Sequence, residues 1–174
     1  MFLGLAGLLY ALYYFGYERY LAPDMRLDNW MNHFVAEQAA AIIRALGYSS
    51  TVIVYPPYPE LVIIDTHMAV NIGTGCNGLP MLYLFAAFVI AHPGPLRRKA
   101  WFLPLGILII HGLNMVRVVA LGFIAVYYRQ WFYINHKYLY VIAVYSLIVA
   151  LFAWWHFRLA DPAKPALPRL GKAR

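Results

Sequence analysis

Three side chains of this 174-residue sequence have the chemistry needed to break and form acyl bonds, namely Cys76, Arg117 and His136. Cys76 is the only cysteine, and it lies in a glycine-rich stretch, residues 71–80, that leads into a long apolar run. A thiolate is a strong nucleophile, a nearby cation stabilises it, and an imidazole moves protons near neutral pH. We therefore predict that Cys76 is a catalytic nucleophile and that His136 acts as acid and base. Arg117 either favours the thiolate or stabilises the developing oxyanion.

The stretch around Cys76 carries glycines at positions 73, 75 and 78, which keep bulk away from the sulfur and allow backbone conformations that other residues resist. Its backbone N–H groups from Gly75 to Gly78, at the start of a helix, are candidate donors to an oxyanion, and Asn77 is a further supporting residue. The alternative interpretation is that Cys76 is a small buried hydrophobic side chain, as most free cysteines are.

Polar residues interrupt the apolar run that contains Arg117. Asn114 lies three residues before Arg117, so the two share one face of a helix, and we expect Asn114 to orient the guanidinium. His111 lies one turn earlier and is interpreted as a polar group satisfied between helices. A charge within an apolar span is costly and usually faces protein or a cavity, which favours a function for Arg117 over contact with lipid headgroups.

The composition is that of a polytopic membrane protein in contact with lipids, because 63% of the residues are hydrophobic and 12% are charged. The net charge of +7 comes from basic residues beside apolar runs, a pattern that sets membrane topology, so we expect no nucleic-acid partner. A single cysteine excludes an intrachain disulfide and a multi-cysteine metal site, and we expect neither a bound metal nor a cofactor. The predicted spans are residues 2–17, 79–91, 101–128 and 138–155. Residues 129–137, between the last two spans, are predicted to form a loop outside the membrane.

Residues 18–75 are predicted to lie outside the membrane. Residues 28–46 have the spacing of an amphipathic helix, with Asp28 as its N-cap and Gly47 just beyond its end. After this helix the period changes to that of strands rich in β-branched residues, which form a hairpin or a meander. The predicted strands are residues 51–55, 61–64 and 68–72.

The predicted fold is therefore an all-α polytopic membrane protein with about four transmembrane helices plus a small extracytoplasmic amphipathic helix and β-hairpin. Residues 1–158 form a single integral membrane domain, in which residues 18–75 are the extracytoplasmic insertion. Residues 159–174 form a basic cytoplasmic tail. The first apolar run has no basic segment before it, so we interpret it as a retained span and not as a signal peptide.

Basic residues in the short loops give the orientation. Arg97, Arg98 and Lys99 are separated from the basic tail by two spans, so both ends lie on the cytoplasmic side. A helix that rises about 1.5 Å per residue from Ala100 carries Arg117 about 25 Å away, close to the outer boundary of the bilayer. The three reactive groups are therefore expected at one depth, on the extracytoplasmic face.

The turn Cys76-Asn-Gly-Leu79 before one span, the motif Asn114-Met-Val-Arg117 on the next, and His136 ahead of a third resemble the exosortase/archaeosortase family. The resemblance covers residues 73–155. Larger members of that family have more spans before the cysteine, so this chain resembles a compact variant. Many members also carry a smaller residue where Asn77 stands.

The resemblance implies a multi-pass cysteine protease and transpeptidase of the bacterial or archaeal cytoplasmic membrane. Its substrates would be exported proteins with a C-terminal sorting signal, which consists of a short motif, a transmembrane helix and a basic cluster. Cleavage at the outer face would pass through a thioacyl intermediate on Cys76, after which the new carboxyl end is transferred to an acceptor.

Two other functions fit parts of the sequence. Asp65 and His67 are two residues apart on a predicted strand and, with Cys76 and His136, have the side chains of a zinc site. The chain could also be a non-enzymatic membrane assembly subunit, whose Asn, Ser and His side chains hold helices together.

Overall fold

The computed structural model of the chain describes residues 7, 11, 26–54, 60–73 and 75–160. The predicted first span lies outside the described residues, except for positions 7 and 11. Of the predicted basic tail, residues 161–174 also lie outside the described residues.

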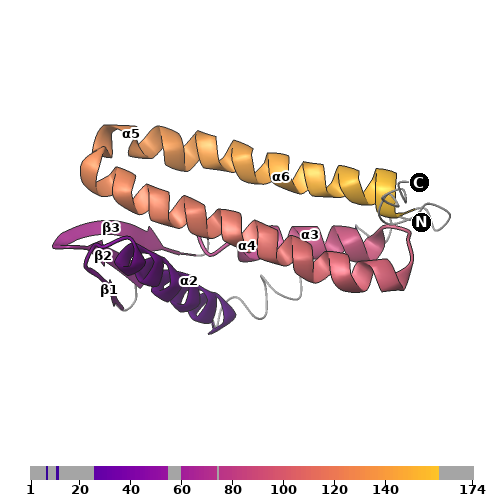
Figure 1. Cartoon of the computed structure of the whole chain (residues 1–174), viewed down its shortest axis with the longest axis horizontal. Coiled ribbons are helices and arrows are strands. Elements are labelled where there is room, and N and C mark those ends of the chain that lie inside the picture. The colour runs from indigo at the N-terminus through magenta and orange to yellow at the C-terminus, as the bar shows by residue number, and fades with distance from the viewer. Residues whose placement is uncertain (1–6, 8–10, 12–25, 55–59, 74, 161–174) are drawn as a thin grey trace, which may run out of the picture.

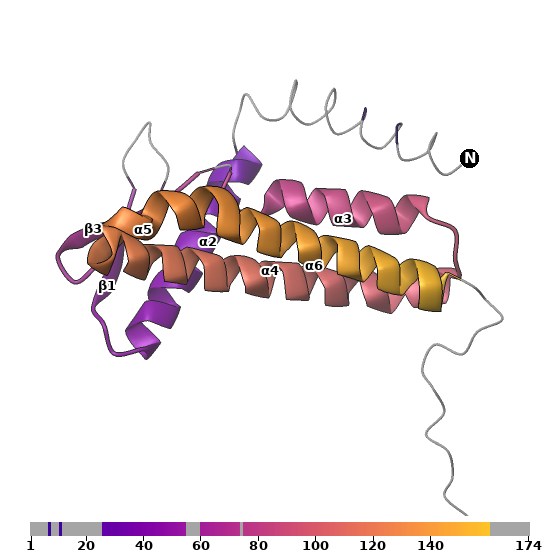
Figure 2. The same ribbon diagram turned by 90° about the horizontal axis from the view of Figure 1, so that it is seen from above.

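The longest helix, α4 (Leu96–Tyr127), runs the length of the molecule. A second helical stretch lies beside it, made of α5 (Arg129–Ile134), the π-helical turn η2 (Asn135–Leu139), α6 (Tyr140–Trp154) and the π-helical turn η3 (Trp155–Leu159). Figure 1 shows α3 beside one half of α4, and α2 with the sheet beside the other half. Figure 2, seen from above, also shows α3 along one half of α4 and α2 at the other half. One half of the bundle is therefore built from α3, α4 and α6, and the other half is covered by α2 and the sheet.

Residues 129–137, predicted as an extramembrane loop, are helical. Tyr128 alone separates α4 from α5, and its N–H still bonds to the Ile124 carbonyl at 2.9 Å. The polar and aromatic side chains of this segment favoured a loop, but these residue types are also tolerated in a helix at a membrane interface. His136 therefore lies inside a helical stretch and not at its opening.

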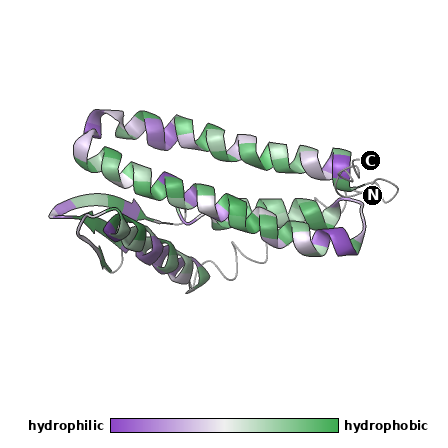
Figure 3. Cartoon of the chain, in the orientation of Figure 1, coloured by the Kyte–Doolittle hydropathy of each residue, from purple (hydrophilic) through white to green (hydrophobic). Residues whose placement is uncertain are grey.

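Two helical stretches, Leu96–Tyr127 and Arg129–Leu159, are long and apolar enough to cross a membrane by length and composition. The third apolar helix, α3 (Leu79–Ala91), has the bounds that the sequence predicts. Its 13 residues extend about 20 Å, less than the roughly 30 Å of a hydrocarbon core. Figure 3 shows that apolar residues dominate α3, α4 and α6, whereas α2 carries a polar face.

The part of the chain predicted to lie outside the membrane contains α2 (Arg26–Ala45) and a three-stranded antiparallel sheet in the order β1-β2-β3. The meander form of the prediction is thus confirmed. The alternating burial along β2 places Val62 and Ile64 on the covered face, and a register shift lies between Val62 and Ile63. The strands are β1 (Ser50–Ile53), β2 (Glu60–Ile64) and β3 (His67–Ile72).

The two ends of α2 differ in how well the sequence predicts them. Gly47 has a φ of 95°, and its N–H bonds to the Arg44 carbonyl while the N–H of Tyr48 bonds to that of Ile43. This is the Schellman arrangement, so the predicted C-terminal glycine is confirmed. The predicted N-cap is wrong, because α2 begins at Arg26 and Asp28 lies in its first turn.

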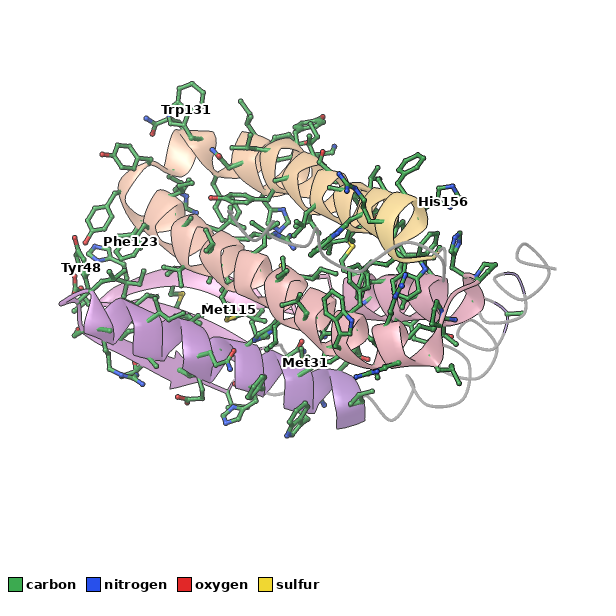
Figure 4. The ribbon with its side chains drawn as sticks, turned by 45° about the vertical axis from the view of Figure 1, so that its right-hand side comes forward. Met31, Tyr48, Met115, Phe123, Trp131 and His156 are labelled. Carbon is green, nitrogen blue, oxygen red and sulfur yellow. The ribbon has the colours of Figure 1, made fainter. Side chains whose placement is uncertain are left out.

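Buried side chains form two cores that meet along α4. The outer core joins α2, the sheet and the second half of α4. At the border of this core, the ring of Tyr48 packs edge-to-face on Phe123, with ring centroids 4.9 Å apart (Figure 4). The inner core joins α3, α4 and α6. It contains Phe85, Val89, Phe102, Ile110, Val144, Ile148, Leu151, Trp155 and Leu159.

Two basic side chains tie the helices together at the end of the inner core. Arg98 Nη1 donates to the Leu159 carbonyl at 3.0 Å, and Lys99 Nζ donates to the Ile90 carbonyl at 2.8 Å. Basic side chains commonly satisfy the last carbonyls of helices in this way. Because Lys99 contacts Ile90, the start of α4 and the end of α3 lie at the same level.

Gly106 lets α4 approach α3 closely. A Cβ at this position would overlap the ring of Phe85, which is fully buried and stacks on Phe152. We expect Gly106→Ala to lower the free energy of unfolding by about 1–3 kcal/mol, the usual cost of overpacking a core. The measurement is the melting temperature in detergent.

The matched control for this change is Gly112→Ala on the same helix, because a Cβ there would meet nothing within 4 Å. The control should melt at or above the wild-type temperature, since alanine favours the helix. Adding Phe85→Leu to Gly106→Ala should recover much of the loss. Equal melting temperatures for the two alanine variants would contradict this packing.

Candidate active site

The Cys76 turn, residues 75–78, connects the end of β3 to the start of α3. The N–H groups of Cys76 and Asn77 both donate to the Gly73 carbonyl, at 2.8 and 3.1 Å. These bonds close the turn and hold the cysteine at its tip. They also engage two of the backbone N–H groups that the sequence suggested as oxyanion donors, so these two groups are not free for that role in this conformation.

Only one of the turn glycines is required by the geometry. Gly78 has a φ of 79°, and a Cβ on it would lie 3.1 Å from Asn114 Nδ2. Residues other than glycine adopt this conformation at a cost, so Gly78 is fixed both by its backbone and by its neighbour. The sequence suggested that Gly75 keeps bulk away from the sulfur, but the structure has room for a side chain there, because a Cβ would meet nothing within 4 Å.

The sulfur of Cys76 lies at the meeting point of the other two predicted residues. His136 Nε2 is 3.7 Å from Sγ, and Arg117 Nη2 donates to Sγ from 3.9 Å. The three side chains come from separate elements: the turn before α3, the second half of α4, and η2. The structure therefore brings together an acid–base group, a cation and a thiol around one atom.

Arg117 is held inside the protein and does not reach out to the surroundings. Its exposed fraction is 8%, and its Nε has no hydrogen-bond partner among the described residues. The phenol of Tyr140 on α6 lies within electrostatic range of the guanidinium. A buried guanidinium with a free N–H is costly, which is the condition expected of a group that meets a ligand.

Asn114 holds the turn and not the guanidinium. Its Nδ2 donates to the Cys76 carbonyl at 3.0 Å, and the side chain is buried. The i,i+3 spacing correctly places Asn114 and Arg117 on one face of α4, but the amide of Asn114 is used to fix the backbone of the nucleophile. The expected role in orienting Arg117 is thus replaced by one in orienting Cys76.

His136 lies in the π-helical turn η2, where the α-helical register is interrupted. Its ring stacks on Phe132, one turn earlier, with centroids 5.5 Å apart and planes 17° apart. Short π-helical segments are frequent at functional sites because the extra residue in the turn re-aims a side chain. Here the π turn and the stacking fix the imidazole so that it faces Cys76.

The chain matches the sequence profile of the family described as transmembrane exosortase over residues 2–157. It belongs to the transmembrane exosortase family. No curated protein and no solved structure matches it. Exosortases are, as a family, membrane cysteine peptidases and transpeptidases that act on exported proteins with sorting signals.

The metal-binding alternative is not supported by the geometry of this exosortase. Asp65 lies in the turn between β2 and β3 with a φ of 53°, and its carboxylate accepts from the Ser49 hydroxyl at 3.2 Å. It does not share a strand face with His67, as the spacing suggested. The part of the chain that the structure describes contains no group of three or more His, Cys, Asp or Glu side chains arranged to hold a metal ion.

The polar residue one turn before Asn114 has the structural role that the sequence predicts. His111 Nε2 hydrogen bonds with Gln38 Oε1 on α2 at 2.7 Å, and its ring stacks on Phe34 with centroids 5.8 Å apart. His111 is therefore a satisfied polar group between helices. It lies outside the cluster around Cys76.

Sequence reasoning missed two residues that touch this site in the exosortase. Phe132, which stacks on His136, could have been found as the aromatic side chain four residues earlier, once residues 129–137 are assigned to a helix. Asp28, whose carboxylate contacts Asn77, carried no such signal because 49 residues separate them. Its position in the first turn of a helix suggested a local role only.

Proposed function

We propose that this exosortase cleaves the C-terminal sorting signal of exported proteins at the outer face of the membrane, with Cys76 as nucleophile. The observation that supports this proposal most directly is the approach of both His136 Nε2 and Arg117 Nη2 to Cys76 Sγ, at 3.7 and 3.9 Å. A thiol beside a base and a cation is the arrangement that activated cysteine nucleophiles share.

The reaction proceeds by acyl transfer through a thioester. His136 takes the proton of the Cys76 thiol, and the thiolate attacks the carbonyl carbon of the scissile peptide bond. The tetrahedral intermediate collapses as the C–N bond breaks, and His136 returns the proton to the leaving amine. An acceptor nucleophile or water then gives its proton to His136 and attacks the thioester carbonyl. As the C–S bond breaks, His136 passes this proton to the departing sulfur and so restores the Cys76 thiol.

Arg117 serves both of the roles that the sequence leaves open. A guanidinium has five N–H donors, so Nη2 can contact the sulfur while Nε remains for the oxyanion. The engagement of the Cys76 and Asn77 N–H groups within the turn favours Arg117 over the backbone as the oxyanion donor. A preorganised charged donor in a site with little water is the strongest form of such stabilisation.

The depth of the site matches a substrate that is itself anchored in the membrane. Arg117 lies 18 residues after Lys99, which corresponds to about 27 Å along α4. With the basic residues of α4 on the cytoplasmic side, the Cys76 cluster lies close to the outer boundary of the hydrocarbon core. A peptide segment just outside a substrate's transmembrane helix would meet Sγ at this level.

The proposal is tested by trapping the thioester. A tagged exported precursor with a C-terminal sorting signal is co-expressed with the protein, quenched in acid and separated without reductant. We expect an adduct of enzyme and the amino-terminal part of the substrate that neutral hydroxylamine releases, because it cleaves thioesters. The adduct should be absent from Cys76→Ala. An adduct of the same kind in that variant would overturn Cys76 as the nucleophile. A precursor that stays unprocessed, with no adduct to the wild-type protein, would leave the assembly-subunit interpretation.

A further inference from the structure

A buried carboxylate of α2 contacts the Cys76 turn from outside the three elements that carry the reactive groups. Asn77 Nδ2 donates to Asp28 Oδ1 at 3.0 Å. The exposed fraction is 0% for Asn77 and 5% for Asp28, so this bond is shielded from water. It joins the first turn of α2 to the residue that follows the nucleophile.

The amide of Asn77 can adopt only one orientation here. Its Oδ1 accepts the N–H of Leu79, the first residue of α3, at 3.0 Å. Its NH₂ group must therefore face α2, and the partner there must be an acceptor. A carboxylate is an acceptor only, and the first turn of a helix favours its negative charge.

The Cys76 turn is thus held by side chains from two different helices. Asn114 on α4 holds the carbonyl of Cys76, and Asp28 on α2 holds the side chain of the next residue. Sγ lies at the outer limit of hydrogen-bond range from His136 and Arg117, so a small displacement of the turn breaks both contacts. A misplacement of about 1 Å in a catalytic constellation can cost about a hundredfold in rate.

We propose that Asp28 is a positioning residue of the transpeptidase, which acts through Asn77 to keep Cys76 against Arg117 and His136. This inference rests on the proposed function, because the quantity that it controls is the rate at which Cys76 attacks substrate. It also assigns a role in the active site to α2, which joins the sheet and α4 in the outer core.

The test compares substitutions that remove, weaken and reverse the contact. Asp28→Ala removes the acceptor, whereas Asp28→Asn keeps an acceptor oxygen without the charge. Asn77→Asp places two carboxylates against each other, and the double variant Asp28→Asn with Asn77→Asp restores one donor and one acceptor in reversed order. Glu37→Ala, an exposed acid later on α2, is the matched control.

Processing of a tagged precursor is measured per unit of folded enzyme, together with the rate at which iodoacetamide alkylates Cys76, the only thiol in the chain. We expect Asp28→Ala and Asn77→Asp to lose at least about tenfold in processing, and Asp28→Asn to stay within about threefold. The double variant should regain most of what Asn77→Asp loses. Alkylation should slow in the same order, because the thiolate loses its stabilising neighbours.

Processing by Asp28→Ala equal to that of Glu37→Ala would overturn the inference. If Asp28→Ala does not accumulate in the membrane, the double variant decides. Recovery relative to Asn77→Asp supports the inference, and no recovery overturns it. Cys76→Ala is measured in parallel. Normal processing by Cys76→Ala would refute the proposed function itself. If only the inference about Asp28 is wrong, Cys76→Ala still loses processing.

Discussion

Cys76→Ala and Cys76→Ser should abolish processing of exported precursors, with a loss of at least about a thousandfold in rate. Removal of the nucleophile alone can cost about as much as removal of the whole catalytic unit, since the covalent intermediate then cannot form at this position. Serine keeps the size and position of the side chain, but its hydroxyl is a much weaker nucleophile than a thiolate beside Arg117 and His136. Loss of processing in the serine variant, which keeps the size of the side chain, would therefore show that the reactivity of the thiol is needed and not its volume.

The measurement is the ratio of precursor to mature form of a tagged substrate in cells, with the amount of enzyme in the membrane determined in parallel. Cys76 contributes little volume to the outer core, so both variants should accumulate like the wild type. Because the chain has no other cysteine, a small membrane-impermeant thiol reagent reports on this position alone. Wild-type maturation in both variants would end the proposal of a cysteine enzyme.

Arg117→Ala should lower the processing rate by about a hundredfold to a thousandfold, the range observed when a preorganised oxyanion donor is removed. Arg117→Lys is the more informative change. Lysine keeps a positive charge near Sγ but presents a single ammonium in place of a planar fork with five N–H donors. We expect the alkylation rate of Cys76 to remain near that of the wild type in this variant while processing falls at least about tenfold.

This difference distinguishes the two roles of Arg117. Equal processing by Arg117→Lys and the wild type would show that charge alone is needed and that Nε does not contact the oxyanion. Parallel losses of alkylation and processing in Arg117→Lys would assign the residue to the thiolate only. Arg129→Ala, which removes an exposed arginine at the start of α5, controls for the loss of a basic side chain.

The candidate residues could be selected from the sequence by their chemical types and by their order along apolar segments. The sequence predicts that these residues share one depth in the membrane. Their approach to a single sulfur atom could not be derived, because it depends on where α4 passes the Cys76 turn and on the π-helical turn at His136. A charge within an apolar span has few inexpensive environments, so the sequence alone indicates a function for Arg117. An interfacial histidine such as His136 has many favourable environments, so the residue type alone says less about its function.

The fold was predictable where the hydrophobic period was strong. The bounds of α3, the strand pattern and the glycine at the end of α2 all follow from local preferences. The segment from Arg129 to Lys137 was mispredicted because its polar and aromatic residues are compatible with both a loop and an interfacial helix. Local sequence predicts a helix cap at Asp28, whereas in the structure Asp28 contacts Asn77, 49 residues away.

The short length of α3 has a consequence for the lipids around the protein. The end of α3 is level with Lys99, so the roughly 20 Å of this helix fall short of the thickness of an ordinary hydrocarbon core. In the proposed topology the Cys76 turn covers the remaining distance to the outer boundary. The proposed topology therefore creates a hydrophobic mismatch, which membranes relieve by local thinning. The scissile bond would then reach Cys76 where the outer leaflet is locally thinned. The acyl-chain length of the host membrane would therefore affect how readily substrates enter the active site.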